Sequence, residues 1–370
     1  MKKSILLFVV IVFALILSLF VFYLRQPFLG DTDLVFDARI VGDVDANTSI
    51  NNSGYLILEP LEVAKILSRR DSYDLSGGGR VVIRVTGDVA PVRVADIKLR
   101  EKGMSYGFDG QGIRQLLSES DYTLVNLETP LISNCPARNV GMIFCGMSGF
   151  ATAMKEAGVD IVGLANNHSL NYGRDGLEQT VRYLREQGLV PLGFSEDYIF
   201  SDGGMTFGIL ALNGVGSQID RKEVARQIAE LKLKVDVIIV SIHWGAEYTL
   251  LPQRAAGVAP DDTVKLGRWL VNQGVDLVVG HHPHVVQGIE VYNEKLIVYS
   301  HGNFLFDQEW SRETKEGVVG TYVFEGGYLV DAYFTPVIIE DWVRPRVADE
   351  DDAENIFRRM RESSKEIKGL

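Results

Sequence analysis

Three histidines lie within four residues, at His281, His282 and His284, in a chain that contains only six histidines. They follow residues 275–279, a short apolar run rich in β-branched residues that predicts a buried strand. Pro283 fixes φ between His282 and His284, which lowers the entropy lost when the turn is ordered. Neutral imidazole is a common ligand for zinc, iron and copper. The cluster therefore favours a metal site over the alternative, a polar surface loop whose histidines only form hydrogen bonds.

Other apolar runs that predict strands also end in residues with ligand-type side chains. The run 81–86 precedes Asp88, 122–126 ends at Asn126 just before Glu128, 160–165 precedes Asn167 and His168, and 235–242 precedes His243. The carboxyl ends of strands in α/β sheets line the crevice where ligands bind. We therefore expect these side chains to converge with the three histidines.

Each of these residues has a simpler explanation when it is taken alone. Asp88 fits a turn after Gly87, Glu128 fits a solvated turn, and the amides of Asn166 and Asn167 are typical of turns. His243 alone fits a hydrogen-bonded core histidine. A shared site remains the better interpretation, because all of the simpler explanations would have to hold together.

A mixed set of carboxylates, amides and imidazoles suits zinc, manganese or iron rather than calcium. Such a centre, with one or two divalent ions, can polarise a phosphoryl or carbonyl oxygen and lower the pKa of water. His168 follows a candidate ligand and is a candidate general acid for the leaving group. Further residues are candidates for a second row around the metal or for substrate contacts: Asn126, Asn166, Glu247, His281 and Asn303.

Strands alternate with helical patterns from residue 81 onward, which predicts an α/β domain with a largely parallel sheet. The later runs 296–300, 318–324 and 328–336 lack helical crossovers and predict antiparallel pairing, so we expect mixed sheets packed face to face. The last thirty residues predict a charged surface helix with Ile356, Phe357 and Met360 on its apolar side.

Lys2 and Lys3 precede an uncharged apolar run, 4–24, that would span roughly 30 Å as a helix. The run is longer than a signal peptide's and lacks a small-residue cleavage site, so we interpret it as an uncleaved signal anchor, with a cleaved peptide as the alternative. The lysines favour a cytoplasmic N-terminus and an extracytoplasmic C-terminal domain on a single-pass membrane protein. The expected organisation is an anchor (1–30), a stalk or extension (31–80), the main domain (81–340) and a C-terminal helix (341–370).

The formal net charge of −12 argues against nucleic acid as a partner, since phosphate binding needs a basic face. An anionic substrate would have to be held locally, by metal and a few cations. Cys135 and Cys145 are the only cysteines, and outside the cytoplasm they most simply form a disulfide rather than part of a metal site.

The chain resembles the CapA family, which is linked to poly-γ-glutamate capsule synthesis and related to calcineurin-like metallophosphoesterases. The matching stretches occur in family order: VTGDVAP, VNLETPL, LANNHSLNYGRDGLEQT, SIHWGAEY, VDLVVGHHPHVVQGIE and VYSHGNFLF. The resemblance implies a four-layer α/β/β/α metallophosphoesterase-like sandwich with mixed sheets. It also implies a metal centre with ligands at Asp88, Glu128, Asn167, His243, His282 and His284, and an acid at His168.

Two positions depart from the phosphoesterase pattern. The first motif there is Asp-x-His, whereas this chain has Ala90 at the histidine position. The second motif usually offers aspartate, and here Glu128 takes its place. The loss of one imidazole weakens one of two metal sites, which leaves the number of ions open.

Two functions are compatible with these observations. The first is a metal-dependent hydrolase acting on a phosphoester or an amide of a cell-surface polymer. The second is a non-catalytic assembly or export factor that binds the polymer or its membrane synthase.

Overall fold

The computed structural model describes residues 36–37, 49–50, 55–57, 61–68, 79–193 and 197–368. The chain divides into two compact units, Met1–Leu58 and Glu59–Leu370. In the first unit, β1 (Phe36–Asp37), β2 (Ser49–Ile50) and β3 (Tyr55–Ile57) form an antiparallel sheet in the order β1-β3-β2. The expected signal anchor at 4–24 lies outside the described residues. Within the described part of the chain, no helix has the length and apolar character needed to cross a membrane.

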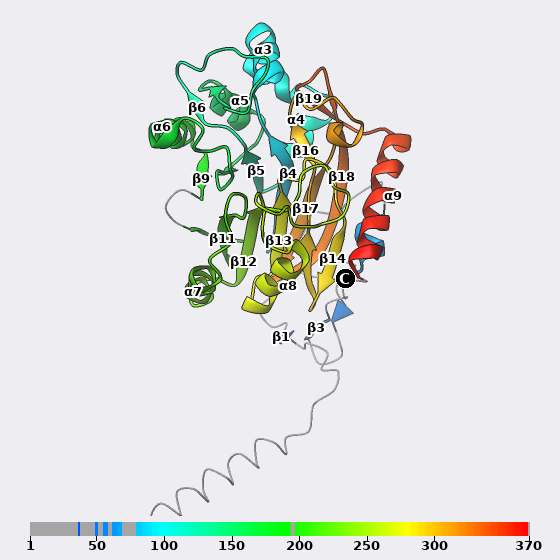
Figure 1. The fold of residues 1–370 in the computed structure, drawn as a ribbon. Helices are drawn as coiled ribbons and strands as arrows, with labels where there is room; N and C mark the ends of the chain where they lie inside the picture. Colours follow the sequence, from blue (N-terminus) through cyan, green and yellow to red (C-terminus); the bar gives the residue numbers. More distant parts are fainter. Residues whose placement is uncertain are drawn as a thin grey trace, which may run out of the picture. The chain divides into compact units, whose positions relative to one another are not determined.

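The second unit contains two large sheets (Figure 1). The eight-stranded sheet has the order β19-β18-β17-β4-β5-β8-β9, with β16 also paired to β4. Its strands are β4 (Arg80–Val89), β5 (Tyr122–Leu127), β8 (Ile161–Gly163), β9 (Val190–Leu192), β16 (Asn303–Leu305), β17 (Glu316–Glu325), β18 (Tyr328–Glu340) and β19 (Arg344–Val347). The short strands β6 (Leu131–Ile132) and β7 (Gly146–Met147) pair separately.

The six-stranded sheet has the order β10-β11-β12-β13-β15-β14. Its strands are β10 (Tyr198–Asp202), β11 (Met205–Asn213), β12 (Val237–His243), β13 (Leu277–His281), β14 (Ile289–Tyr292) and β15 (Lys295–Val298). The central pairs are parallel and the edge strands β10 and β14 are antiparallel, so both sheets are mixed.

One strand prediction needs correction. The run 296–300 was expected to be antiparallel, yet β15 pairs parallel with β13 on one side and antiparallel with β14 on the other. The physical reason is that β14 lies between β13 and β15 in sequence. The chain therefore returns to the starting end of the sheet along β14, and no helical crossover is needed for parallel pairing.

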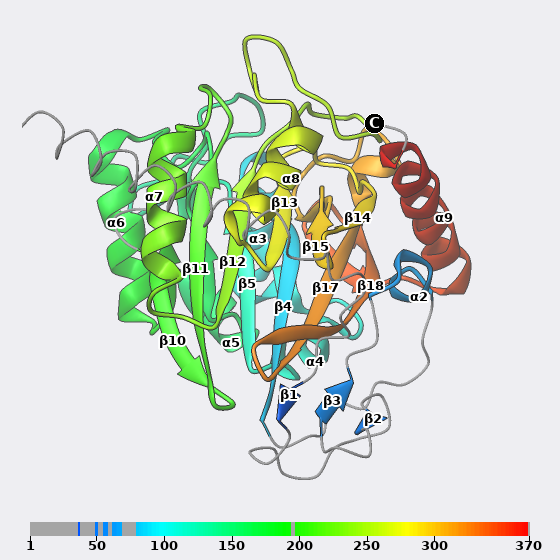
Figure 2. The ribbon, with the colours of Figure 1, turned by 90° about the horizontal axis from the view of Figure 1, so that it is seen from below.

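Three apolar cores separate four layers of secondary structure. One core lies between the sheets, with residues such as Val85, Ile239 and Phe324. A second lies on the outer face of the eight-stranded sheet, beneath α3 (Arg93–Lys102), α4 (Ile113–Ser118), α5 (Phe150–Glu156) and α6 (Gly173–Glu186). A third lies beneath α7 (Arg221–Leu231) and α8 (Thr263–Gln273), which cover the six-stranded sheet (Figure 2). The mixed α/β prediction is confirmed, and the layers follow the order α/β/β/α.

Helix α9 (Glu350–Ile367) runs beside β14 and β18 at the edge of both sheets (Figures 1 and 2). Asp349 caps its first turn by accepting a hydrogen bond from the backbone N of Asp352 at 3.0 Å. Ile356, Phe357 and Met360 are buried in the core between the sheets. The helix therefore closes this edge of the central core.

The sequence predicts a stalk or an N-terminal extension at 31–80, and residues 61–68 of that range belong to the second unit. The short helix α2 (Val63–Ile66) lies in the second unit, and both Ile66 and Leu67 are buried in the core between the sheets. Val63, Ile66 and Leu67 recur at helical spacing, which favours a short helix, but this spacing does not say which surface the helix packs on.

Candidate metal centre

The end of β4 places Asp88 at the centre of the site. To reach this position, the backbone of β4 packs closely against Gly302. Only glycine fits at position 87, since a Cβ on Gly87 would lie 2.3 Å from the carbonyl oxygen of Gly302. The backbone N of Asp88 donates to that same carbonyl at 2.9 Å. Asp88 is fully buried, and its Oδ2 accepts a hydrogen bond from the backbone N of His282 at 3.1 Å. This hydrogen bond joins β4 directly to residues 281–284, which we call the histidine loop.

Asn126 and Glu128 enter the site from the end of β5. Strand register sets Asn126 opposite Asp88, and the amide nitrogen of Asn126 donates to Oδ1 of Asp88 at 2.8 Å. The same nitrogen lies 3.3 Å from Oε1 of Glu128 and 3.3 Å from Nδ1 of His243. Asn126 therefore holds two carboxylates and an imidazole around one amide.

His243 ends β12, the neighbour of β13 in the six-stranded sheet, and lies 1% exposed. Its Nε2 is 2.9 Å from Oδ1 of Asn167, which follows β8 in the other sheet. Its ring centroid is 4.6 Å from that of His282. The two sheets therefore contribute to one site, as the strand-end argument predicts.

The histidine loop has a constrained backbone. His282 and His284 have φ values of 96° and 58°, which place both in a region that non-glycine residues rarely adopt. Such strain persists where the surrounding structure enforces it, and it is concentrated at functional sites. The loop turns both imidazoles inward, where they are 1% and 2% exposed, with ring centroids 5.7 Å apart.

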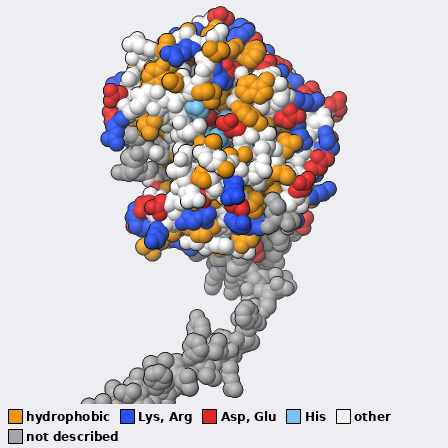
Figure 3. All heavy atoms as spheres, viewed as in Figure 1, with side chains coloured by type: hydrophobic (Ala, Val, Ile, Leu, Met, Phe, Trp, Pro, Cys, Tyr) orange, Lys and Arg blue, Asp and Glu red, His pale blue; other side chains and the backbone are white. Residues whose placement is uncertain are grey.

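Two groups of side chains bring ligand atoms within 4.8 Å of one another. The first group is Asp88, Glu128 and His284, and the second is Glu247, His282 and His284. Glu247 was expected only as a second-row or substrate contact, and the structure brings its carboxylate into ligand range. In the space-filling view, histidine and carboxylate atoms lie side by side near the middle of one face (Figure 3).

Burial shifts the pKa values of these groups in ways that suit cation binding. Burial raises the pKa of Asp88, but the neighbouring His281 and His284 outweigh it and hold the pKa well below its usual range. Burial and the charge of Asp88 raise the pKa of Glu128 well above normal. Burial lowers the pKa of His243 well below normal and that of His282 to about 3. The imidazoles of His243 and His282 are therefore neutral near pH 7, which is the form that binds metal.

Several buried polar atoms of the site have no hydrogen-bond partner among the described residues. They are Oε2 of Glu128, Nε2 of His281 and both ring nitrogens of His282. An unsatisfied buried polar group costs about 1–3 kcal/mol, so such a set is rarely found together without a ligand. A divalent cation would satisfy carboxylate oxygens and imidazole lone pairs together, and the residues present therefore fit a zinc, manganese or iron site.

Ala90, the position at which this chain lacks the histidine of the phosphoesterase motif, lies in apolar surroundings. Ala90 is fully buried in a small apolar cluster with Val92, Phe144 and Phe306. The edge of the Phe306 ring packs on His284, with centroids 5.0 Å apart. Apolar side chains therefore occupy the surroundings of the position where the phosphoesterase motif has an imidazole.

His168 lies beside these groups and is 6% exposed. Its Nδ1 is 3.1 Å from Oδ1 of Asn171, which also accepts a hydrogen bond from the backbone N of Phe144 at 2.7 Å. Because the backbone N of Phe144 donates to Oδ1 of Asn171, this oxygen and not the amide nitrogen faces His168. Nδ1 of His168 therefore carries the proton, and Nε2 is available to a substrate. The Phe144 ring stacks on His168 with centroids 4.1 Å apart. Burial lowers the pKa of His168 to about 4.

The remaining predicted residues contact the candidate ligands or shape the loops that carry them. Asn166 accepts hydrogen bonds from the backbone N of His168 and Ser169 at 3.1 and 3.0 Å and thereby shapes the loop after β8. Oδ1 of Asn303 is 3.1 Å from Nδ1 of His284, while its amide nitrogen donates to Thr314 and Gln308. Nδ1 of His281 lies 3.4 Å from Oδ1 of Asp88.

Cys135 and Cys145 form a disulfide that closes the segment carrying Phe144. The bridge is buried next to Ile132, at the base of that segment. The disulfide thus tethers the aromatic ring that packs on His168.

Sequence reasoning missed four residues around the site: Arg93, Phe144, Asn171 and Asp307. The spacing of Asn171 three residues after His168 is a local signal that could have been used. The other three are far apart in sequence and belong to no pattern, so only the fold brings them together.

Residues 82–308 match the protein family described as "Bacterial capsule synthesis protein PGA_cap". The chain is 26% identical to "Capsule biosynthesis protein CapA" of Bacillus anthracis over 309 residues, covering 76% of this chain and 73% of that one. It is 28% identical to "PGA biosynthesis protein CapA" of Bacillus subtilis over 266 residues, covering 65% and 67%. A solved structure entitled "Putative 5'-Nucleotidase from Staphylococcus aureus in complex with alpha-ketoglutarate" aligns with a TM-score of 0.46 and 16% identity, covering 76% of this chain and 58% of the other.

Proposed function

Since the chain belongs to the bacterial capsule synthesis protein family PGA_cap, we propose that it is a metal-dependent hydrolase in the synthesis of a capsule or poly-γ-glutamate polymer. Its substrate would be a phosphoester or an amide of that surface polymer. The proposal takes the α/β/β/α layers as a metallophosphoesterase-like fold.

The observation that supports this function best is the group of buried ligand atoms without partners. Glu128 Oε2 and both ring nitrogens of His282 have no partner among the described residues, although each lies within a ligand group. A purely structural cluster would pair these atoms with one another or with backbone groups, because each orphan is destabilising. Buried atoms of this kind, left without partners inside two ligand groups that share His284, are characteristic of a site that binds a cation.

A divalent cation held by these residues would supply Lewis acidity toward a phosphoryl or carbonyl oxygen. The chain's own residues orient the reaction. Asn126 fixes Asp88 and Glu128, and Asn303 fixes His284, so the acceptor atoms are set before substrate arrives.

His168 presents Nε2 to the substrate while Asn171 holds its Nδ1 proton. With a pKa lowered to about 4 by burial, the neutral ring predominates near pH 7 and accepts a proton more readily than it donates one. The role of general acid that we propose for it requires a negatively charged substrate group beside the ring, which would raise its pKa.

The test combines metal analysis with turnover on a panel of phosphodiesters and γ-glutamyl amides, using the full-length protein. We expect stoichiometric divalent metal in the wild type, loss of metal and turnover in His282→Ala, and loss of turnover with retained metal in His168→Ala. A His168→Ala variant with normal turnover would remove His168 from the mechanism. Full turnover by protein stripped of metal with a chelator would refute the metal-dependent function.

A second function, a non-catalytic assembly factor, is favoured by one specific observation. Val140, Met142 and Ile143 are 71%, 60% and 59% exposed on the disulfide-closed segment beside the site. Apolar side chains gathered on a surface are typical of contacts with another protein, here a membrane synthase. If His282→Ala leaves polymer production intact in cells at normal protein levels, the assembly role replaces the hydrolytic one.

The proposed location is the outer side of the cell membrane, with the apolar run 4–24 as a single-pass anchor. The proposal is supported by the lysines that precede this run and by the disulfide between Cys135 and Cys145, since disulfides persist outside the reducing cytoplasm. Membrane fractionation with protease protection tests both parts.

A further inference from the structure

Arg93 begins α3 in a rarely adopted backbone conformation, with a φ of 50°. Its Nε donates to the two carboxylate oxygens of Asp307 at 3.0 and 3.2 Å, and Nη2 also contacts that carboxylate. Asp307 is itself held by the backbone N of Val94 at 2.9 Å. Nη1 has no oxygen acceptor among the described residues, and its polar contact there is Sδ of Met142 at 3.9 Å. The guanidinium is therefore fixed in place with one nitrogen left to bind an acceptor.

Two aromatic rings connect Arg93 to the metal centre. Its guanidinium carbon lies 5.0 Å from the ring centroid of Phe144 and 5.4 Å from that of Phe306. Phe144 stacks on His168 at 4.1 Å, and Phe306 packs edge-on against His284 at 5.0 Å. The Arg93 guanidinium is thus separated by one aromatic ring from His168, the candidate acid, and by another from His284, a candidate ligand.

A second arginine shares the space next to Arg93. Arg93 and Arg138 line one small pocket together with Val140, Ile143 and Phe144. Arg138 is exposed and makes no hydrogen bond or ion pair with any residue that the structure describes. Asp307 pairs with Arg93, and Asp96, which also lines this pocket, pairs with Arg100, so Arg138 adds a positive charge that these carboxylates do not offset. Guanidinium groups bind carboxylate and phosphate through paired hydrogen bonds.

We propose that Arg93 and Arg138 form an anion subsite that binds a carboxylate or phosphate group of the substrate next to the bond being cleaved. The inference rests on the proposed function, because it assigns the neighbouring group of the same substrate. An acidic polymer carries such a group on each repeat, so one repeat would lie at the metal centre while the adjacent anion is held by the arginines.

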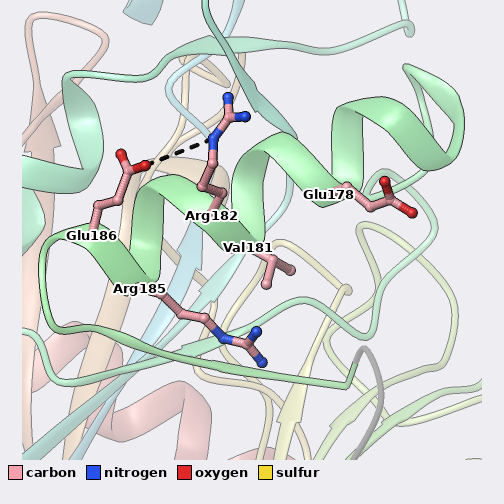
Figure 4. Close-up of a pocket in the computed structure, with 5 residues that line it drawn as sticks. All are labelled: Glu178, Val181, Arg182, Arg185 and Glu186. Carbon is pink, nitrogen blue, oxygen red and sulfur yellow. Dashed lines mark ion pairs between the residues drawn. The ribbon is translucent and has the colours of Figure 1, made fainter.

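The experiment measures binding of two probes, a γ-linked glutamate oligomer and inorganic phosphate, to the full-length protein by calorimetry. Each probe is titrated into manganese-loaded protein and into protein treated with a chelator. The variants are Arg93→Ala, Arg138→Ala and Arg138→Lys. The matched control is Arg185→Ala, an exposed arginine of α6 that extends from the helix beside the Arg182–Glu186 ion pair and forms no ion pair with the residues that the structure describes (Figure 4).

We expect Arg93→Ala to weaken binding of at least one probe roughly tenfold and Arg138→Ala roughly threefold, since a charge-assisted hydrogen bond is lost in each. Arg138→Lys should retain most of the affinity and Arg185→Ala all of it. Arg93→Ala leaves Asp307 buried without its partner and can unfold the protein. Arg138→Ala breaks no contact within the described chain, so it carries the test in that case.

The results separate the subsite from the metal-dependent function. Equal affinities of Arg138→Ala and Arg185→Ala for both probes would overturn the subsite, even if metal binding and turnover are normal. Arginine-dependent binding that persists after chelation supports the subsite even if no metal is bound and the hydrolase function fails. Binding of the oligomer alone identifies a carboxylate ligand, binding of phosphate alone identifies a phosphoester, and either result supports the subsite.

Discussion

At the scale of single residues, the amide of Asn126 keeps two buried carboxylates apart. Its nitrogen donates to Asp88 and Glu128 at once. Replacing it with aspartate would put a third acidic oxygen where a donor now lies. We expect Asn126→Asp to lower the free energy of unfolding of metal-free protein by about 2 kcal/mol, because the carboxylates lose a hydrogen bond and repel one another.

The same substitution should enlarge the stabilisation by metal. Manganese would relieve the added repulsion, so the rise in Tm on adding manganese should be greater in Asn126→Asp than in the wild type. Thermal denaturation with and without chelator measures both effects. Asn272→Asp, on the exposed face of α8, is the control and should change neither. An equal metal-induced shift in both variants would show that Asn126 does not border the cation.

The chemistry of most site residues could be predicted from sequence, and their roles only in part. Asp88, Glu128, Asn167, His243, His282 and His284 are recognisable because each follows an apolar strand. Glu247 comes four residues after its strand, and its entry into ligand range depends on the path of the loop. Arg93 and Asp307 are separated by more than half of the chain, so no local pattern could have paired them.

At the scale of elements, the contact between β4 and the segment before β16 fixes Asp88. We expect Gly87→Ala to destabilise the protein by about 3 kcal/mol, because its Cβ would overlap the carbonyl oxygen of Gly302. Metal affinity should fall as well, since the hydrogen bond from Asp88 N to Gly302 O would be lost. Chemical denaturation and metal titration provide the two measurements.

Gly149→Ala is the matched control for this substitution. Its added Cβ would meet only Cγ of Met104, at 3.6 Å, and its backbone has a helical φ of −61°. Alanine there should be neutral or slightly stabilising. If Gly87→Ala is as stable as Gly149→Ala and binds metal normally, β4 does not need this close approach.

The disulfide acts on the segment that holds Phe144 against His168. We expect Cys135→Ser with Cys145→Ser to cost up to about 3 kcal/mol of stability, because a closed loop of about ten residues is released in the unfolded chain. Turnover should fall more than metal content, since Phe144 packs on His168 rather than on the cation-binding oxygens. Turnover that stays normal at a temperature where the double variant is folded would contradict this role of the segment.

Helix starts are easiest to recognise in sequence where a polar cap precedes an amphipathic run. Asp220 caps α7 in this way, by accepting from the backbone N of Lys222 and Glu223. Asp261 and Asp262 both precede α8, and it is Asp262 that caps the helix. Asp261 instead accepts from the backbone N of Ile219 at 2.8 Å. That competing contact is a tertiary one, and it is invisible in the local sequence.

At the scale of the whole molecule, α9 connects the two loops that supply the second ligand group. Oγ of Ser363 accepts from the backbone N of Gly288 at 3.0 Å and donates to the carbonyl of Leu250 at 2.9 Å. Gly288 follows the histidine loop, and Leu250 follows Glu247 closely in sequence. We expect Ser363→Ala to cost about 2 kcal/mol, because the buried backbone N of Gly288 and the partly buried carbonyl of Leu250 lose their partner, and to weaken metal binding several-fold.

Calorimetric metal titration and denaturation measure these effects. Glu362→Ala is the control on the same helix, because its side chain is 58% exposed and pairs with Arg358 at the surface. Equal metal affinity in the two variants would limit α9 to a role in stability.

The layered architecture was accessible from sequence because strand and helix periods differ, and because the later runs lack crossovers. The packing of residues 61–68 was not accessible in this way. Ile66 and Leu67 join the central core, and the helical spacing of the apolar residues around them does not by itself reveal this packing partner. These residues are buried because the other elements leave one edge of the central core open, and α2 and α9 together cover that edge.

His284 belongs to both ligand groups. Asn303 donates through its amide nitrogen to Gln308 and Thr314, so its oxygen accepts the Nδ1 proton of His284 at 3.1 Å. With its proton on Nδ1, the ring can offer a lone pair only on Nε2, and a single lone pair coordinates a single ion. Two cations in this pocket would therefore compete for one nitrogen, and the binding isotherm for metal should show one strong site followed, at most, by a much weaker one.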